Sequence, residues 1–191
     1  MKFFYVVLLF LWSATSIMAQ NYFDSFVGKL DVDYTCLPNK APDDFRGNFL
    51  KKEQYMVVPH DCYLLKSRSL VKNKYGQDSY LRYWLSYYLF KDTTECKAAV
   101  ERYSSTVAKR IGGFKYKEDG AAKTAPMVMI FNSKNIFCLY GRCETELDPS
   151  WESLKNAFIA EYAEKGAMLL IAKCGYVQWE TYDNKFFSEE R

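Results

Sequence analysis

The stretch that most constrains the fold is Tyr80–Phe90, a run of strong β-formers that contains no glycine and no proline. Such a run predicts one long strand. One face is apolar or aromatic throughout and carries Leu81, Tyr83, Leu85, Tyr87 and Leu89. The other face mixes aromatic rings with a guanidinium and hydroxyls and carries Tyr80, Arg82, Trp84, Ser86, Tyr88 and Phe90. A half-exposed sheet would place plain polar residues there, so the second face suits either core packing or a cavity wall with a few placed polar groups.

The first nineteen residues have the pattern of a secretory signal peptide. Lys2 precedes an apolar run, Phe3–Trp12, and a small-residue segment, Ser13–Ala19, which predicts cleavage after Ala19. We therefore expect a secreted, extracellular protein with a signal peptide over 1–19, a single domain over 20–180 and a tail over 181–191. The formal charge is +3 for the whole chain and one less without the leader, which carries one lysine and no acid. A charge so near neutrality gives no reason to expect a nucleic acid partner, and no later apolar run is long enough to span a membrane.

All six cysteines lie beyond the predicted leader: Cys36, Cys62, Cys96, Cys138, Cys143 and Cys174. An even number in a secreted chain predicts up to three disulfides, with about 15 possible pairings. A zinc site is disfavoured, because there is no Cys-x-x-Cys pair and His60 is the only histidine. We expect no metal and no cofactor.

The remaining elements follow from local patterns. A short helix capped by Asp43 or Asp44 precedes two strands, Gln54–Pro59 and Cys62–Leu70. After Tyr80–Phe90, we expect a strand at Phe114–Glu118, a hairpin made of Met127–Phe131 and Ile136–Tyr140, a helix over Pro149–Lys165, and a final strand over Met168–Trp179 interrupted at Cys174–Gly175. The helix is capped by Asp148 and followed by Gly166, and its apolar stripe is Trp151, Leu154, Phe158 and Tyr162.

Residues 92–111 decide between two architectures. Apolar residues recur there at helical spacing, yet Val100–Tyr103 and Thr106–Ile111 also fit two short strands. A helix would make residues 80–179 an α+β ferredoxin-like sandwich with βαββαβ order. Strands would make the chain an all-β, eight-stranded antiparallel lipocalin-type barrel with a short N-terminal helix and a C-terminal helix packed outside.

The order of residues over about 36–174 resembles tick salivary lipocalins. The segments that carry the resemblance are Cys36–Val58, His60-Asp61-Cys62, Phe90-Lys91-Asp92, Phe114–Gly120, Met127–Cys138, Asp148–Gly166 and Cys174. The resemblance implies the barrel, and a saliva protein that sequesters small host inflammatory mediators such as histamine and other biogenic amines, or eicosanoids. It also supports a Cys62–Cys174 disulfide, which leaves Cys36, Cys96, Cys138 and Cys143 to pair among themselves in an order that stays open.

Two departures from the family bear on the ligand. The Gly-x-Trp start motif of lipocalins is absent, and Leu139 follows Cys138 where relatives that bind amines carry Cys-Asp. The second departure weakens the amine reading.

On the barrel reading, five residues of the second face would line the cavity: Arg82, Trp84, Ser86, Tyr88 and Phe90. Aromatic walls hold an acyl chain or a flat ring by burial, and Arg82 would pair with a carboxylate. An amine would instead need an inward carboxylate. We therefore expect a small amphipathic acid, an eicosanoid or a fatty acid, in preference to an amine. The same residues also fit a simpler account, in which Arg82 is a surface arginine and Trp84 and Tyr88 are core.

An enzyme is a poor fit. His60 is the only histidine and lies in a predicted surface turn, and neither Gly-x-Ser-x-Gly nor a phosphate-binding glycine loop occurs. The second hypothesis is a secreted inhibitor that binds a host defence protein, such as complement, a platelet protein or a protease, through surface loops. We expect a monomer in either case.

Overall fold

The computed structural model describes residues 22–30, 33–38, 62–72, 75–103, 126–142, 150–173 and 176–183. Three predicted elements therefore lie outside the described residues: the helix after Asp43 or Asp44, and the strands Gln54–Pro59 and Phe114–Glu118.

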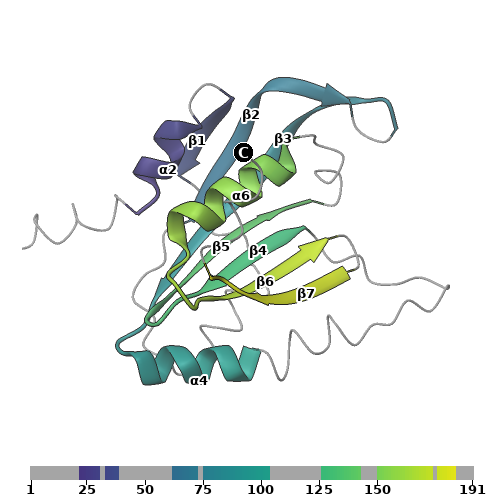
Figure 1. Ribbon diagram of the computed structural model, residues 1–191. Helices are drawn as coiled ribbons and strands as arrows, with labels where there is room; N and C mark the ends of the chain where they lie inside the picture. Colours follow the sequence, from purple (N-terminus) through teal and green to yellow (C-terminus); the bar gives the residue numbers. More distant parts are fainter. Residues whose placement is uncertain are drawn as a thin grey trace, which may run out of the picture.

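The described residues form three helices and seven strands (Figure 1). The helices are α2 (Asp24–Lys29), α4 (Thr93–Tyr103) and α6 (Trp151–Tyr162). The strands are β1 (Tyr34–Pro38), β2 (Cys62–Lys72), β3 (Asp78–Leu89), β4 (Met127–Phe131), β5 (Asn135–Gly141), β6 (Met168–Lys173) and β7 (Tyr176–Thr181).

All seven strands belong to one antiparallel sheet in the order β1-β2-β3-β5-β4-β6-β7. The long aromatic run forms β3, an interior strand with β2 on one side and β5 on the other. The β4–β5 hairpin was predicted, and its two ends meet as Phe131 opposite Ile136. Residues 168–179 were expected to form one interrupted strand, but they form the antiparallel hairpin of β6 and β7.

A β-rich antiparallel fold was predicted correctly, but the closed eight-stranded barrel is not what the described residues form. Their sheet is open, with β1 at one edge and β7 at the other. One reason lies between β3 and β4, where residues 93–103 form a helix, so the expected strand Val100–Tyr103 is wrong. The other expected strand, Thr106–Ile111, lies outside the described residues. β5 then pairs with β3, so β4 lies one place further out.

The alternative, a ferredoxin-like sandwich, predicts the order of elements correctly but places both helices on one face of the sheet. From β3 to β6 the order is βαββαβ, as that alternative required. The two helices lie on opposite faces of the sheet, however, because α6 packs in one apolar cluster and α4 in the other. The sheet therefore separates two apolar layers.

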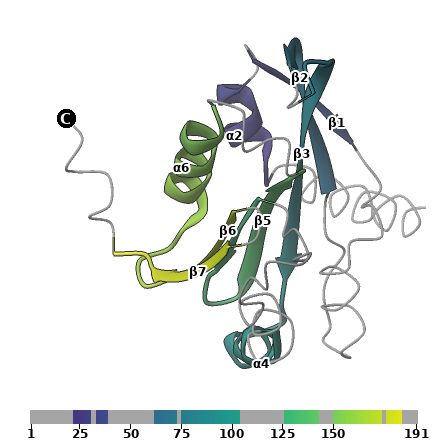
Figure 2. The same cartoon turned by 90° about the vertical axis from the view of Figure 1, so that its right-hand side faces the viewer.

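The first layer holds α2 and α6 side by side against the sheet (Figure 2). The predicted helix stripe is confirmed, since Trp151, Leu154 and Phe158 are buried in this layer and Tyr162 packs against it. Trp151 stacks on Tyr83 with ring centroids 5.7 Å apart. The apolar face of β3 thus faces the helix that the sequence predicted, although α6 is shorter than Pro149–Lys165.

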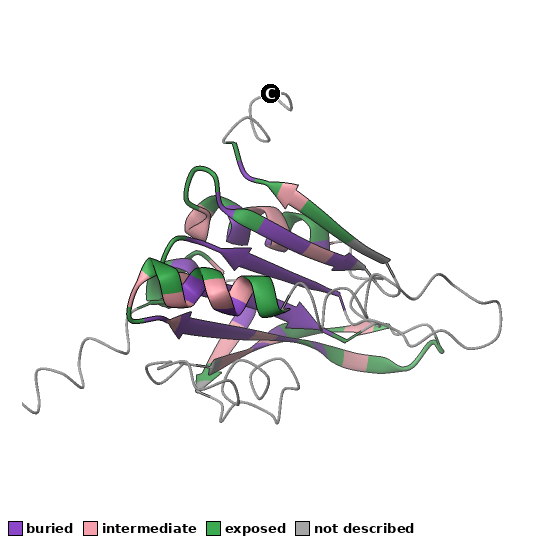
Figure 3. Ribbon diagram, turned by 90° about the horizontal axis from the view of Figure 1, so that it is seen from below, coloured by how far each residue is buried: buried purple, intermediate pink, exposed green. Residues whose placement is uncertain are grey.

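The second layer covers the other face of β3 and continues across β5, β4 and β6. Its fully buried members include Tyr88, Met129, Ile136 and Leu170. α4 contributes to it at the end of the sheet where β3 finishes (Figure 2). The central strands are buried along most of their length, whereas residues 178–181 of β7 are mostly exposed (Figure 3).

Candidate functional site

The five residues predicted to line a cavity differ in their exposure. Ser86, Tyr88 and Phe90 are buried, Trp84 is half-buried and Arg82 is exposed. Tyr88 and Phe90 belong to the second layer, and Trp84 packs against it. From Trp84 to Phe90 this face of β3 therefore packs in or against the second layer, and the role of these residues in ligand binding stays a prediction.

Trp84 lies where the second layer meets cationic side chains. Its ring stacks on that of Tyr140, with centroids 5.5 Å apart. The guanidinium of Arg142 lies 5.9 Å from the centroid of the Trp84 ring, which is within the range of a cation–π contact. The sequence did not predict that Arg142 would lie beside Trp84, because this contact depends on the pairing of β5 with β3.

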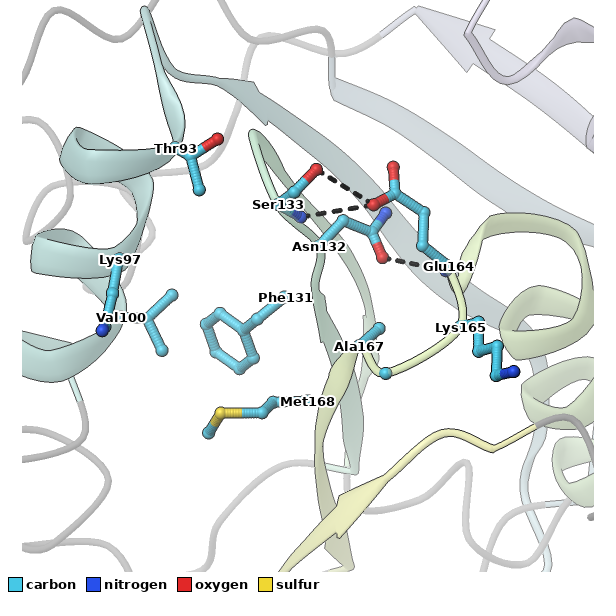
Figure 4. A pocket seen from close by; sticks show the side chains of 11 residues that line it. Thr93, Lys97, Val100, Phe131, Asn132, Ser133, Glu164, Lys165, Ala167 and Met168 are labelled. Atoms are coloured by element: carbon cyan, nitrogen blue, oxygen red, sulfur yellow. Dashed lines mark hydrogen bonds between the residues drawn. The ribbon is translucent and has the colours of Figure 1, made fainter.

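A pocket of about 340 Å³ opens at the α4 end of the molecule (Figure 4). Its size falls in the range of sites for small ligands. The wall formed by α4 carries Thr93, Lys97 and Val100. The opposite wall comes from the β4–β5 turn and from the loop between α6 and β6: Phe131, Asn132, Ser133, Glu164, Lys165, Gly166, Ala167 and Met168. None of the five predicted residues lines it.

Buried Asn132 holds the opposite wall together. Its amide Nδ2 donates to Asn135 Oδ1 at 2.8 Å and to the carbonyl oxygen of Tyr162 at 2.9 Å. Its Oδ1 accepts from the backbone N–H of Glu164 at 3.1 Å. These bonds tie the hairpin turn to the end of α6, where Gly166 adopts a positive φ of 83° that favours glycine. The sequence predicted the turn but gave no sign that Asn132 would be buried.

Glu164 completes this side of the pocket. Its Oε2 accepts from the backbone N–H of Ser133 at 3.3 Å and from the Ser133 hydroxyl at 3.1 Å (Figure 4). One oxygen of the only carboxylate in the lining is therefore already occupied by donors of the protein.

The pocket is continuous with the second layer through two side chains. Phe131 belongs to that layer, together with Tyr88 and Phe90, and Val100 packs against it. Trp179 stacks on Phe131 with centroids 5.6 Å apart and is 38% exposed. The second layer, which contains Tyr88 and Phe90 of β3, thus reaches solvent at this end of the molecule.

Lysines flank the apolar walls. Lys97 stands exposed on the α4 side, and the amine of Lys165 points away from the pocket (Figure 4). An apolar floor with a cation near its mouth has the chemistry that an amphipathic acid requires.

Among the described residues, Cys36 and Cys96 have free thiols. Burial, with a smaller effect of Glu164, raises the pKa of Cys96 to about 12, and its thiol donates to the carbonyl oxygen of Asn132 at 3.5 Å. Burial and the charge of Asp24 raise the pKa of Cys36 to about 11. Both are therefore protonated near neutral pH.

Cys36 and Cys96, two of the four cysteines expected to pair among themselves, are therefore not in a disulfide in the structure. The side chains of Cys62, Cys143 and Cys174 lie outside the described residues, so the Cys62–Cys174 pairing stays a prediction.

Within the described ranges, no group of three or more His, Cys, Asp or Glu residues could hold a metal ion. None of the described helices is long and apolar enough to cross a bilayer. His60 lies outside the described residues. Comparison with protein-family models, with curated proteins and with solved structures gives no match.

Proposed function

We propose that this chain is a secreted carrier that sequesters a small amphipathic acid, of the eicosanoid or fatty-acid class, as the resemblance to tick salivary lipocalins implies. The observation that carries the proposal is the pocket of about 340 Å³ that opens from the second layer. The acyl chain contacts Val100, Phe131 and Met168, and the carboxylate lies near Lys97.

The packing of α6 supports a ligand on this side of the sheet. α6 covers the face of β3 that carries Tyr83 and Leu85. The opposite face, with Trp84 and Tyr88, is the one that extends to the pocket. A carrier needs such an apolar surface, because burial of the hydrocarbon supplies most of its affinity, at about 25 cal/mol per Å².

The charges favour an acid over an amine. Lys97 lies in the pocket lining, and Glu164 already accepts two hydrogen bonds from Ser133 through one oxygen. A bound ammonium would need a carboxylate of its own in order to leave water. A bound carboxylate would instead find Lys97, whose ammonium is a strong donor.

The test is titration of the secreted protein with a fluorescent fatty acid, followed by displacement with an unlabelled eicosanoid. Lys97→Glu reverses the charge at the pocket, and Lys91→Glu makes the same change at an exposed residue outside the lining. We expect Lys97→Glu to weaken binding of the acid by about tenfold, which corresponds to about 1.4 kcal/mol. Lys91→Glu should leave binding unchanged.

The methyl ester of the same fatty acid distinguishes the contribution of the carboxylate charge to affinity from that of burial of the acyl chain. Because the ester has no carboxylate, Lys97→Glu should not change its affinity. Absence of acid binding by the unmodified protein would overturn the proposal, and an equal effect of the two lysine variants would remove Lys97 from the site.

A further inference from the structure

β2 and β3 extend beyond the rest of the sheet. β1 pairs with β2 only as far as Ser67, and β5 pairs with β3 only from Tyr83. Beyond those points Leu70–Lys72 pairs with Asp78–Tyr80 as a two-stranded arm, visible at the upper right of Figure 1. We call residues 66–72 and 75–82 the β2–β3 ribbon.

The ribbon has a defined shape at its base. The pairing register shifts between Lys66 and Leu70, which marks a bulge in β2. The Ser67 hydroxyl accepts from the backbone N–H of Leu81 at 2.9 Å and donates to the carbonyl oxygen of Ser69 at 2.8 Å. Bulges of this kind bend a strand and increase its twist, so the arm is held at a fixed angle to the sheet.

Exposed apolar side chains are concentrated on the ribbon. Of the seven large apolar residues that are exposed in the described part of the chain, three lie here: Leu70 at 55%, Tyr75 at 71% and Tyr80 at 42%. Leu70 and Tyr80 are directly opposite each other in the ladder, so their side chains share one face. Single exposed apolar residues are common, but here two share one face and a third lies in the turn of the same projecting arm. We call these three residues the patch.

Cations surround this patch. The described ribbon carries Lys66, Arg68, Lys72 and Arg82 and a single carboxylate, Asp78. Its excess of positive charge equals the formal charge of the whole chain, +3, so the rest of the chain is close to neutral. The Lys66 ammonium lies 3.9 Å from the centroid of the Tyr80 ring, and Lys66 faces Arg82 across the ladder. By this register Lys66, Lys72 and Arg82 share the face of Leu70 and Tyr80, and the Lys72 ammonium lies 3.4 Å from Asp78 Oδ1.

We propose that the β2–β3 ribbon docks on a bilayer surface that contains anionic phospholipids. Leu70, Tyr75 and Tyr80 enter the interfacial region, where amphipathic aromatic rings are favoured. Arg82 and the ribbon's other cations contact the headgroups. A soluble polyanion would use the cations alone and would leave Leu70 in water, so the apolar residues favour a lipid surface.

Docking of this kind would hold the carrier at a membrane without inserting a helix. The pocket lies at the α4 end of β3, and the ribbon is at the other end of the same strand. Lipid contact at the ribbon therefore leaves the pocket mouth uncovered, and the proposal does not depend on the identity of the pocket ligand.

The experiment is sedimentation of the full protein with vesicles of phosphatidylcholine, with and without phosphatidylserine. We expect binding only to vesicles that contain phosphatidylserine, and a loss of binding as ionic strength rises. Leu70→Ser should weaken binding, whereas Leu37→Ser, a change at a leucine 44% exposed on the edge strand β1, should not. Arg82→Gln should weaken it about fivefold, while Arg102→Gln on α4 leaves it unchanged.

Soluble heparin serves as the competing polyanion. Heparin binding that Arg82→Gln weakens and Leu70→Ser does not, together with no binding to vesicles, would overturn the lipid proposal in favour of a polyanion. Equal binding to both kinds of vesicle, or equal effects of Leu70→Ser and Leu37→Ser, would also overturn it. Thermal unfolding of each variant confirms that the exposed substitutions leave the fold intact.

Discussion

At the scale of single residues, Asn132 contributes most to the geometry of the pocket. It is 8% exposed, and its side chain bonds to the hairpin turn and to both sides of the α6 terminus. No pattern in the sequence distinguishes it from an ordinary turn asparagine, because its burial depends on where α6 ends. Two of its three partners, Tyr162 and Glu164, lie 30 and 32 residues away in sequence and could not be predicted.

Asn132→Ala should therefore destabilise the protein strongly. The carbonyl of Tyr162 and the N–H of Glu164 would both lose their side-chain partner, and a buried group without a partner costs about 1–3 kcal/mol. We expect the free energy of unfolding to fall by about 3 kcal/mol in urea denaturation. Ser133→Ala, next along the chain and exposed, removes a hydroxyl that bonds to Glu164 and should cost less than about 1 kcal/mol. Similar losses for the two variants would contradict the role of Asn132.

Glu161 gives the protein a dependence on acid pH. Its carboxylate accepts from Lys29 Nζ at 2.5 Å and from the Ser25 hydroxyl at 2.9 Å. These hydrogen bonds, the one from Lys29 first, lower the pKa of Glu161 below its usual value of 4.5. A carboxyl whose pKa is lower in the folded state stabilises that state above its unfolded pKa, and the stability is lost as the pH falls through the folded pKa.

The matching prediction compares Glu161→Gln with the unmodified protein. Because the pair lies at the surface, its contribution at neutral pH should be at most about 1 kcal/mol. We expect the difference in unfolding free energy to be constant above pH 5 and to shrink as the pH falls below about 4.5. A difference in unfolding free energy that grew as the pH fell would contradict this assignment. High salt should reduce the difference at neutral pH.

At the scale of elements, the sequence predicted helices and strands most reliably where one face of the element is buried. The β3 pattern and the α6 stripe were both correct, since alternation and helical spacing report directly on which side of an element meets the core. Residues 92–111 were ambiguous, because Cys96, Ala99 and Tyr103 fit helical spacing while Val100–Tyr103 also fits a strand. For residues 93–103 the structure resolves this ambiguity as α4, where Cys96 and Ala99 face the second layer, and Thr106–Ile111 lies outside the described residues.

Helix α4 begins at a cap that can be tested. Asp92 Oδ1 accepts from the backbone N–H of Glu95 at 2.9 Å, which satisfies one of the unpaired donors of the first turn. Asp92→Ala should cost about 1 kcal/mol of stability, whereas Asp92→Ser should retain most of it. Because α4 forms one wall of the pocket, Asp92→Ala should also weaken binding of the fluorescent fatty acid. Unchanged stability, measured by chemical denaturation, would mean that the cap has no energetic role.

At the scale of the whole molecule, strand order was the property that local patterns could not supply. β3 pairs with β5 across the intervening α4 and β4, and nothing in either strand specifies that partner. The barrel expectation assumed that strands adjacent in sequence are adjacent in space, which holds for β1, β2 and β3 and fails at β5. The pocket depends on this strand order, because its walls are α4, the β4–β5 turn and the loop after α6, so its position could not be predicted either.

The N-terminal segment supplies the last test, because it joins the predicted leader to the core. Phe23 and Phe26 are fully buried, and their rings pack against Phe137 at 6.0 Å and Phe158 at 5.4 Å. A chain that begins at Gln20, after the predicted cleavage, keeps both rings, and a chain that begins at Asp31 loses both. Removal of a buried phenylalanine ring costs about 3–5 kcal/mol, and a domain of this size has about 5–15 kcal/mol in total.

We therefore expect the protein that begins at Gln20 to unfold cooperatively on heating and the protein that begins at Asp31 to be largely unfolded at room temperature. Phe23→Ala with Phe26→Ala, made in the longer chain, separates the loss of the rings from the loss of the backbone of α2. N-terminal sequencing of protein released by a secreting host cell shows which residue begins the mature chain. Equal thermal stability of the two chains would mean that α2 is dispensable, and release of a protein that begins beyond Phe26 would rule out α2 as part of the secreted core.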